Sequence, residues 1–189
     1  MALLQAKDIC LNFGSGDILD HVDLTLDPGE KVCLVGRNGE GKSSLMKILA
    51  GSLEADSGSV IADSGVEIAY LPQEVPDLKG RVLEVVLGGL GKGAELLQDY
   101  ERLSVQVAEK ADPELLARLQ SVQEQIDILE AWDLQRRVET ELRRLKLSAL
   151  DTFEEMSGGM KRQVLMVRAI VSRPKVLILD EPTNHLDIA

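Results

Sequence analysis

One octapeptide of the chain combines glycines, a lysine and a serine at a spacing suited to phosphate binding. Residues 36–43 read Gly-Arg-Asn-Gly-Glu-Gly-Lys-Ser and match the pattern GxxxxGK followed by Ser or Thr. The glycines let backbone N–H groups close around phosphate oxygens, and Lys42 adds a positive charge. The hydroxyl of Ser43 can ligate Mg²⁺, and a helix that begins there points its positive dipole end at the anion. A glycine turn with an incidental lysine is the much weaker alternative.

Two adjacent carboxylates near the end of the sequence offer the complementary chemistry. The apolar run 176–179 is followed at once by Asp180 and Glu181. As a buried parallel strand, this run would carry both acids to the carboxyl edge of a sheet, where ligands bind. We expect Asp180 to hold Mg²⁺, while Glu181 points the other way by strand alternation and can act as general base toward water. An acid that merely ends a strand for solubility is the alternative, which the upstream phosphate loop disfavours.

A third motif precedes a helical stretch. Residues 156–160 read Met-Ser-Gly-Gly-Met, so that Ser157 can cap the helix while Gly158 and Gly159 leave N–H groups accessible to an anion. Taken alone, this segment could equally be an ordinary capped helix.

The elements around these motifs follow from residue patterns. Strand-like segments cover 3–13 and 22–26, and the apolar run 32–35 predicts a buried parallel strand directly before the phosphate loop. A helix follows the loop and ends near Gly51. Short strands at 58–61 and 66–71 predict a small antiparallel subdomain.

Long helices follow from about residue 93. Apolar positions recur at steps of three and four, and Asp112 and Pro113 fit the N-cap and first position of a second helix. Two helices joined by a tight turn predict an antiparallel hairpin. Its apolar stripes consist of Leu96, Tyr100, Leu103 and Val107, then Leu115, Leu119, Val122, Ile126 and Leu129. Helices at 133–146 and 157–172 and a strand at 176–179 complete the series.

Composition limits the classes of function. The net charge of −11 argues against a protein that coats nucleic acid non-specifically. There is no signal-peptide pattern and no apolar run long enough to span a membrane, so we expect a cytoplasmic chain without membrane insertion. Cys10 and Cys33 lie in apolar runs and are expected to be buried, reduced thiols. Neither His21 nor His185 has metal-ligand companions at useful sequence spacing.

The three motifs, in this order, resemble those of the ABC ATPases, and the resemblance covers essentially the whole chain. It implies that ATP and Mg²⁺ bind at Gly36, Asn38, Gly39, Gly41, Lys42, Ser43 and Ser44. It implies that Ser157, Gly158 and Gly159 are the signature residues, which contact ATP held by a second ABC domain, although Met156, Met160 and Lys161 depart from the usual LSGGQ. Gln73 resembles the Q-loop glutamine, a catalytic and metal-sensing residue, and Asp187 resembles the D-loop aspartate. Phe13 resembles the aromatic residue that stacks on adenine, with a core role at a strand end as the equal alternative.

Residues 181–187 read EPTNHLD, which resembles the ABC-F subfamily and, within it, the Uup-like branch. This resemblance implies two ATPase domains in one polypeptide, no membrane domain and action on the ribosome, with a possible link to DNA. The ATPase subunit of a membrane transporter is the alternative. A third possibility is a module that presents the arm 93–147 to RNA or protein without hydrolysis.

The implied fold is α/β: a P-loop ATPase core with a parallel sheet, a small antiparallel subdomain and an inserted helical hairpin. We expect a first core segment over 1–92, the helical subdomain with its hairpin over 93–147, and a segment with the signature and carboxylate motifs over 148–189. Ala189 precedes the position of the family's switch histidine. Residues 1–189 alone are therefore expected to bind ATP but to hydrolyse little of it.

Overall fold

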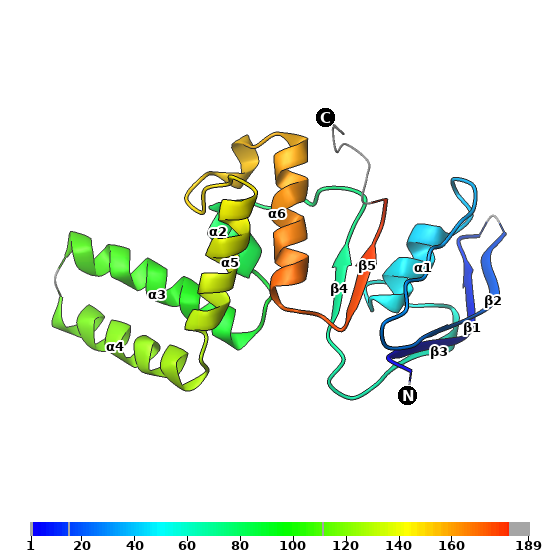
Figure 1. Ribbon diagram of the computed structural model, residues 1–189, viewed down its shortest axis with the longest axis horizontal. Helices are drawn as coiled ribbons and strands as arrows, with labels where there is room; N and C mark the ends of the chain where they lie inside the picture. The colour runs from blue at the N-terminus through cyan, green and yellow to red at the C-terminus, as the bar shows by residue number, and fades with distance from the viewer. Residues whose placement is uncertain (1, 15, 111, 182–189) are drawn as a thin grey trace. The chain divides into compact units, whose positions relative to one another are not determined.

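The computed structural model describes residues 2–14, 16–110 and 112–181. The described chain folds into two units (Figure 1). The first comprises residues 2–74 with 173–181, and the second comprises residues 75–172. The expected α/β fold is confirmed, since the first unit combines antiparallel and parallel strands with a helix and the second is helical.

An antiparallel sheet forms one part of the first unit. Strand β1 (Leu4–Asn12) lies between β2 (Asp17–Leu26) and β3 (Ser57–Ala62). The buried positions of β1 alternate at first, as Leu4 and Ala6 do, and then shift by one residue to Ile9 and Leu11. An extra residue in the strand causes this shift, and it has consequences for the side chains on the outer face.

The phosphate-loop helix and the carboxylate strand share one core with this sheet. Helix α1 (Lys42–Leu49) buries Leu45, Ile48 and Leu49, and these side chains pack in one cluster with β1 and with Val176 and Ile178 of β5 (Val176–Leu179). Strand β5 pairs in parallel with β4 (Ile68–Leu71). Apolar burial therefore fixes α1 and β5 within the same unit, and each carries one of the predicted motifs at its end.

Residues 32–35 do not form the buried parallel strand that their apolar character predicts. Val32 and Val35 are 49% and 90% exposed. A parallel strand needs a neighbour for its backbone hydrogen bonds, and within the described ranges β4 takes β5 as its parallel partner while 32–35 joins no sheet. Cys33 lies in this unpaired run and is exposed, so the expectation that its thiol is buried is wrong. Cys10 is only half-buried.

The second unit consists of helices. They are α2 (Val82–Leu87), α3 (Lys92–Glu109), α4 (Pro113–Ile128), α5 (Trp132–Arg144), the short 3₁₀ helix η1 (Phe153–Glu155) and α6 (Gly158–Val171). Helix α6 packs against α2 and α5, and its Val164, Val167 and Val171 are buried, as their spacing predicts. Met160, expected on the same face, is 37% exposed because it lies in the first turn.

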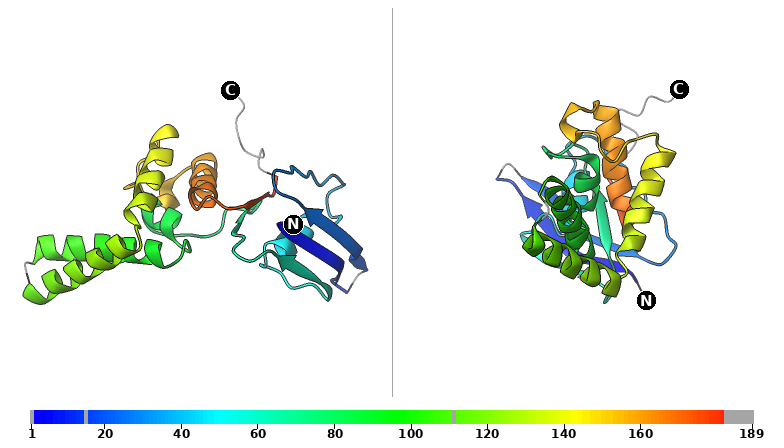
Figure 2. Two further views of the ribbon diagram at one scale, coloured as in Figure 1. Left: turned by 60° about the horizontal axis from the view of Figure 1, so that its bottom comes forward. Right: turned by 90° about the vertical axis from the view of Figure 1, so that its left-hand side faces the viewer.

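Helices α3 and α4 form the predicted antiparallel hairpin and run side by side in both views of Figure 2. The turn chemistry is as predicted: the Asp112 side chain accepts a hydrogen bond from the backbone N–H of Glu114 (2.9 Å), and Pro113 occupies the first turn. The apolar stripe is buried at Leu103 and Ile126. The prediction that Leu129 continues this buried stripe is wrong. Leu129 is 48% exposed because α4 ends one residue earlier.

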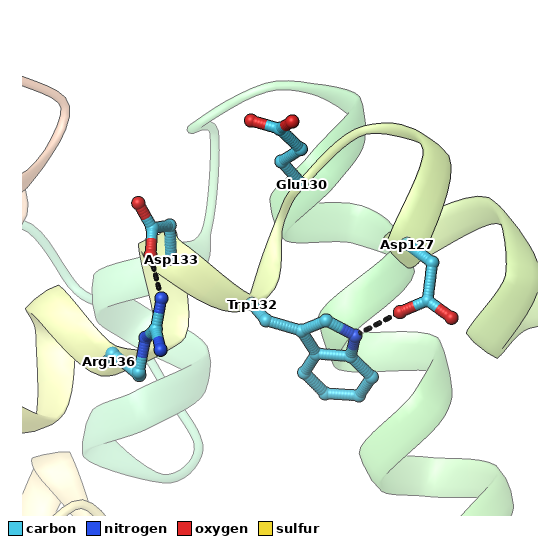
Figure 3. Close-up of a pocket in the computed structure, with 5 residues that line it drawn as sticks. All are labelled: Asp127, Glu130, Trp132, Asp133 and Arg136. Carbon is cyan, nitrogen blue, oxygen red and sulfur yellow. Dashed lines mark hydrogen bonds and ion pairs between the residues drawn. The ribbon is translucent and has the colours of Figure 1, made fainter.

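An aromatic pair fixes the base of the hairpin. The ring of Trp132 meets that of Tyr100 edge-on at a centroid distance of 5.1 Å, and its Nε1–H donates to Asp127 (2.6 Å). Asp133 and Arg136 form an ion pair beside it, and the cavity that these residues line with Glu130 measures about 320 Å³ (Figure 3). Because the contacts of Trp132 join α3, α4 and α5, they hold the hairpin at a defined angle to the rest of this unit.

Candidate functional site

The loop 36–41 leads directly into α1. The side chain of Lys42, the first residue of that helix, points back toward the loop. The ammonium of Lys42 donates hydrogen bonds to the backbone carbonyls of Gly36 (2.7 Å) and Arg37 (2.6 Å). The carboxylate of Glu40 accepts the N–H of Arg37 (2.7 Å). These contacts are local, so the octapeptide itself determines the curvature of the loop and places a positive charge at its mouth, as an anion site requires.

Gly41 connects this loop to the core. Its φ is +82°, and a Cβ at this position would lie 2.7 Å from Ile18 Cγ2 and 2.9 Å from the carbonyl oxygen of Ile18. Gly41 itself is buried. The glycine is therefore needed for two reasons: the backbone conformation disfavours other residues, and the start of α1 packs directly on β2.

We expect Gly41→Ala to displace the loop from β2. The left-handed backbone costs an alanine about 1–2 kcal/mol, and the contact with the Ile18 carbonyl adds to this cost because backbone cannot move aside. The variant should show a lower free energy of unfolding in denaturant titrations and weaker nucleotide binding. Gly51→Ala is the matched control: φ there is +70°, but the methyl group of an alanine would have no atom within 4 Å, so backbone strain acts alone. Equal losses in the two variants would contradict the packing argument.

Asp180 lies buried directly after β5. Only 2% of its surface is exposed, and the hydroxyl of Tyr70 on the paired strand β4 donates to its carboxylate at 3.3 Å. Burial, and then the neighbouring Asp180 charge, raise the pKa of Tyr70 to about 12. The phenol therefore remains a neutral donor at physiological pH and helps to orient the carboxylate.

Gln73 and Glu181 are brought together although 108 residues separate them in the chain. The side-chain amide of Gln73 donates to the Glu181 carboxylate at 2.7 Å. Glu181 has a φ of +47°, so the backbone turns immediately after Asp180. The two acids are separated by this turn, whereas simple strand alternation was the prediction. The turn gives Asp180 a buried environment and leaves Glu181 at the partly exposed edge.

Three residues of the first unit carry donor atoms that suit a hard divalent cation. Ser43 offers a hydroxyl, Asp180 a carboxylate and Gln73 an amide oxygen, all within the first unit. Oxygen donors of this kind favour Mg²⁺ over softer metals. The residues present therefore fit the metal that the sequence predicts.

The remaining predicted residues fall in different places. Phe13 is 60% exposed at the end of β1, so a core role is excluded and its ring is accessible. Ser157 caps α6 and accepts the N–H of Met160 (3.3 Å), with Gly158 exposed beside it. This motif belongs to the second unit. Asp187 lies outside the described residues.

Tyr70 in the first unit and Lys161 in the second make contacts that the sequence does not predict. Tyr70 was not identified, although its position three residues before Gln73 on a strand that pairs with β5 is the signal that could have found it. Lys161, which directly follows Met160 at the usual glutamine position of the signature, donates to the Glu154 carbonyl (2.9 Å) and lies 5.7 Å from the centre of the Phe153 ring. Both contacts of Lys161 are with residues of the second unit.

Among the described residues, none of the helices is long and apolar enough to cross a membrane.

Known proteins resemble this chain over most of its length. A family model described as "ABC transporter" matches residues 19–184. The chain is 40% identical over 189 residues to the ATP-binding protein Uup of Escherichia coli (strain K12) and 37% identical to Uup of Haemophilus influenzae. It is 34% identical over 180 residues to the energy-dependent translational throttle protein EttA of Mycobacterium tuberculosis. The match covers 100%, 100% and 92% of this chain but only 30%, 29% and 32% of these relatives.

A solved structure of the ATP-binding subunit of an ABC transporter superposes with a TM-score of 0.66 at 26% identity, over 98% of this chain and 69% of that one. The phosphate loop, the carboxylate strand end and the signature segment thus occur in the order and fold of one family. The chain belongs to the ABC ATPases and is similar to the Uup-type members of the ABC-F subfamily.

Proposed function

We propose that the protein binds ATP with Mg²⁺ and hydrolyses it together with a second ABC domain, as a cytoplasmic ABC-F ATPase that acts on the ribosome. The observation that carries the catalytic part is the 2.7 Å hydrogen bond between Gln73 and Glu181, beside the buried Asp180. It joins two sequence motifs that are 108 residues apart at the strand edge where the family's chemistry takes place.

The first unit supplies most of the proposed machinery. Lys42 and the N–H groups at the start of α1 bind phosphate oxygens, and Phe13 stacks on adenine. Ser43, Gln73 and Asp180 would hold Mg²⁺, which when bound neutralises negative charge on the phosphates. Glu181 accepts a proton from the attacking water, and Gln73 holds its carboxylate in position.

The second unit supplies the proposed contribution to a partner. Ser157, Gly158 and Gly159 form the capped start of α6, a place where backbone N–H groups favour an anion. In the proposed assembly they contact ATP bound to the second ABC domain. Hydrolysis then requires both domains, which agrees with the expectation of little turnover by residues 1–189 alone.

The α3–α4 hairpin supports a role on the ribosome. Its helices pack on each other, and the exposed distal part contributes little to the rest of the unit, as expected of an arm that contacts a partner. The arginines of α5 do not strengthen this role. Arg136, Arg143 and Arg144 pair with Asp133, Glu139 and Glu141, which favours a solvated helix face over an RNA contact.

Shortening the hairpin tests its proposed role. The base must remain, because Leu96, Leu97 and Ile126 are buried there, so we remove residues 104–118 and join Leu103 to Leu119 through a short Gly/Ser loop. Helices pack about 8–10 Å apart, a distance that four residues span. In the intact protein carrying Glu181→Gln, ribosome co-sedimentation with ATP should fall several-fold, while ATP affinity stays unchanged.

Two controls make this result interpretable. Arg136→Ala removes an exposed charge of α5, outside the α3–α4 hairpin, and should leave co-sedimentation unchanged. Undiminished co-sedimentation of the shortened form would reject the arm as a ribosome contact. Binding of branched DNA in place of ribosomes, lost on the same deletion, would assign the arm to the DNA-linked role instead.

The ATPase subunit of a membrane transporter remains the second candidate, favoured by the likeness to a solved transporter subunit. The phosphate-contacting residues would be the same in both cases. Purification of the intact protein with a membrane subunit, or ATPase stimulation by one, would decide for the transporter.

A further inference from the structure

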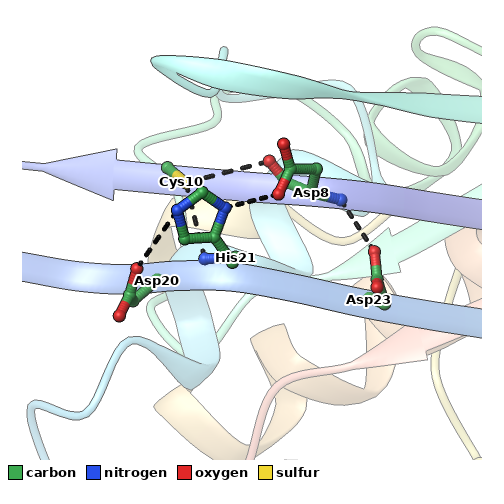
Figure 4. Close-up of polar contacts among 5 residues, drawn as sticks. All are labelled: Asp8, Cys10, Asp20, His21 and Asp23. Atoms are coloured by element: carbon green, nitrogen blue, oxygen red, sulfur yellow. Dashed lines mark hydrogen bonds and ion pairs between the residues drawn. The ribbon is translucent and has the colours of Figure 1, made fainter.

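Four polar side chains gather on the outer face of the β1–β2 pair, apart from the nucleotide site. Asp8 and Cys10 come from β1, and Asp20 and His21 come from β2 (Figure 4). His21 Nδ1 lies 2.5 Å from Asp8 Oδ1, and its Nε2 lies 3.8 Å from Asp20 Oδ1. Ligand atoms of Cys10, Asp20 and His21 all lie within 4.8 Å of one another. A metal site was not expected from the sequence, because Cys10 is separated along the chain from the adjacent pair Asp20 and His21.

Two opposed bulges create this cluster. Between the pairs Ala6↔Leu24 and Ile9↔Val22, β1 has one residue more than β2, and between Ile9↔Val22 and Leu11↔Leu19, β2 has one more than β1. The extra segments contain Asp8 and His21, whose φ angles are +57° and +48°. Bulges re-aim side chains, and here they turn residues of both strands toward a common point.

The bulge at Asp8 is held by specific contacts. The carboxylate of Asp23 accepts the backbone N–H of Asp8 at 2.8 Å. On the other side of β1, a Cβ at Gly58 would lie 2.4 Å from the Asp8 carbonyl oxygen, so only glycine permits this approach. Left-handed backbone at a non-glycine residue costs free energy and persists where surrounding contacts impose it. The arrangement is therefore built into the sheet.

The electrostatic environment of the cluster favours a cation. His21 Nδ1–H donates to the carboxylate of Asp8, and the carboxylate of Asp20 lies on the Nε2 side of the same ring. Two carboxylates on either side of one ring favour a positive charge between them and the ring. The backbone N–H of His21 donates to Cys10 Sγ at 3.4 Å, a contact that holds the sulfur close to the histidine.

We propose that Cys10, His21 and Asp20 bind a divalent transition-metal ion of the Zn²⁺ class, with Asp8 orienting the histidine ring. This inference goes beyond the nucleotide chemistry and is independent of it. Sulfur, imidazole nitrogen and carboxylate oxygen are the ligands of zinc, and three protein ligands leave a fourth position for water. Asp8 on Nδ1 leaves Nε2 for the metal, the arrangement in which a carboxylate fixes the ring of a metal-binding histidine.

The geometry needs only a small adjustment. Bonds of about 2.0–2.1 Å from zinc to nitrogen and oxygen place tetrahedral ligand atoms about 3.3 Å apart. The 3.8 Å separation of His21 Nε2 and Asp20 Oδ1 would thus shorten by about 0.5 Å on binding. Both side chains are more than 70% exposed, so rotation can supply this change. Binding displaces the thiol proton of Cys10.

Cobalt titration tests the site, because Co²⁺ replaces Zn²⁺ and bonds to thiolate with a characteristic near-ultraviolet charge-transfer absorption. We expect the reduced chain, without nucleotide, to develop this absorption with a single saturable phase, and Zn²⁺ to reverse it. Cys10→Ser should abolish the absorption. Asp8→Asn should retain it but weaken cobalt affinity about tenfold, as loss of an orienting carboxylate typically does.

The second cysteine provides the matched control. Cys33 is exposed and lies outside the cluster, so Cys33→Ser should leave the absorption unchanged. Circular dichroism of each variant verifies that the sheet is folded. The proposal is overturned if the wild-type chain shows no thiolate absorption, if Cys10→Ser retains it, or if it follows Cys33. ATP affinity measured on the same variants should not change, which separates this site from the phosphate loop.

Discussion

Lys42→Ala is expected to weaken ATP binding by about 30-fold or more, since removing one partner of a desolvated charge pair costs about 2–5 kcal/mol. The Lys42 ammonium donates hydrogen bonds to the carbonyls of Gly36 and Arg37, so its position over the loop is fixed before a ligand binds. A pre-positioned cation loses little freedom on binding phosphate, and its contribution to affinity is correspondingly large. Calorimetric titration with ATP and Mg²⁺ measures the effect.

The same helix provides the control for this variant. Lys47 lies on α1 in its last turn and is exposed. Lys47→Ala removes the same charge from the same helix but not from the loop, and should leave ATP affinity within about twofold, as surface substitutions usually do. If the two variants bound ATP equally well, the phosphate contact assigned to Lys42 would be wrong.

Local patterns in the sequence predicted the elements that depend on neighbouring residues. Helix α1 begins in the phosphate loop, Asp112 and Pro113 start α4, Ser157 caps α6, and β5 covers the predicted 176–179. Each of these signals lies within a few residues of the element it determines. Capping and helical periodicity are local, so a single sequence is sufficient to find them.

Features that depend on pairing between distant segments were not predicted. The run 32–35 has the composition of a buried strand, yet a strand also needs a neighbour to take its hydrogen bonds. The register of β1 and β2 shifts at three places, two of which are the bulges at Asp8 and His21, and no sequence pattern revealed the extra residues. That is why His21 was dismissed as a ligand, although Cys10 and Asp20 lie beside it in the sheet.

At the end of β5, where Asp180 and Glu181 lie, one feature depends on local sequence and another on the pairing of distant segments. Apolar spacing predicts that Asp180 and Glu181 follow a strand, and this is what the structure shows. The environment of each acid depends on β4, which brings Tyr70 to Asp180 and leads to Gln73 beside Glu181. The sequence predicts that two acids follow the strand. The parallel pairing of β4 with β5 determines which side chains these acids contact.

Glu181→Gln in the intact protein is expected to retain ATP binding while slowing hydrolysis by about 10²–10⁴-fold, the usual contribution of a general base. The substitution conserves shape: the amide oxygen of the new side chain can still accept the hydrogen bond from Gln73, so the local structure is kept while the basic oxygen is lost. Phosphate-release rates at saturating ATP measure the loss in kcat, and calorimetry measures binding.

Glu74→Gln is the matched control for this experiment, because Glu74 is an exposed acid that follows Gln73 directly. It removes the same charge close to the site but not at the strand edge, and should leave kcat near its original value. Parental turnover by Glu181→Gln would show that another group takes the proton. A loss of ATP affinity equal to the loss of turnover would show that Glu181 maintains the site's structure. Slow hydrolysis with intact binding is the combination that general-base catalysis requires, because the base acts on water only in the transition state and contributes nothing to holding the nucleotide.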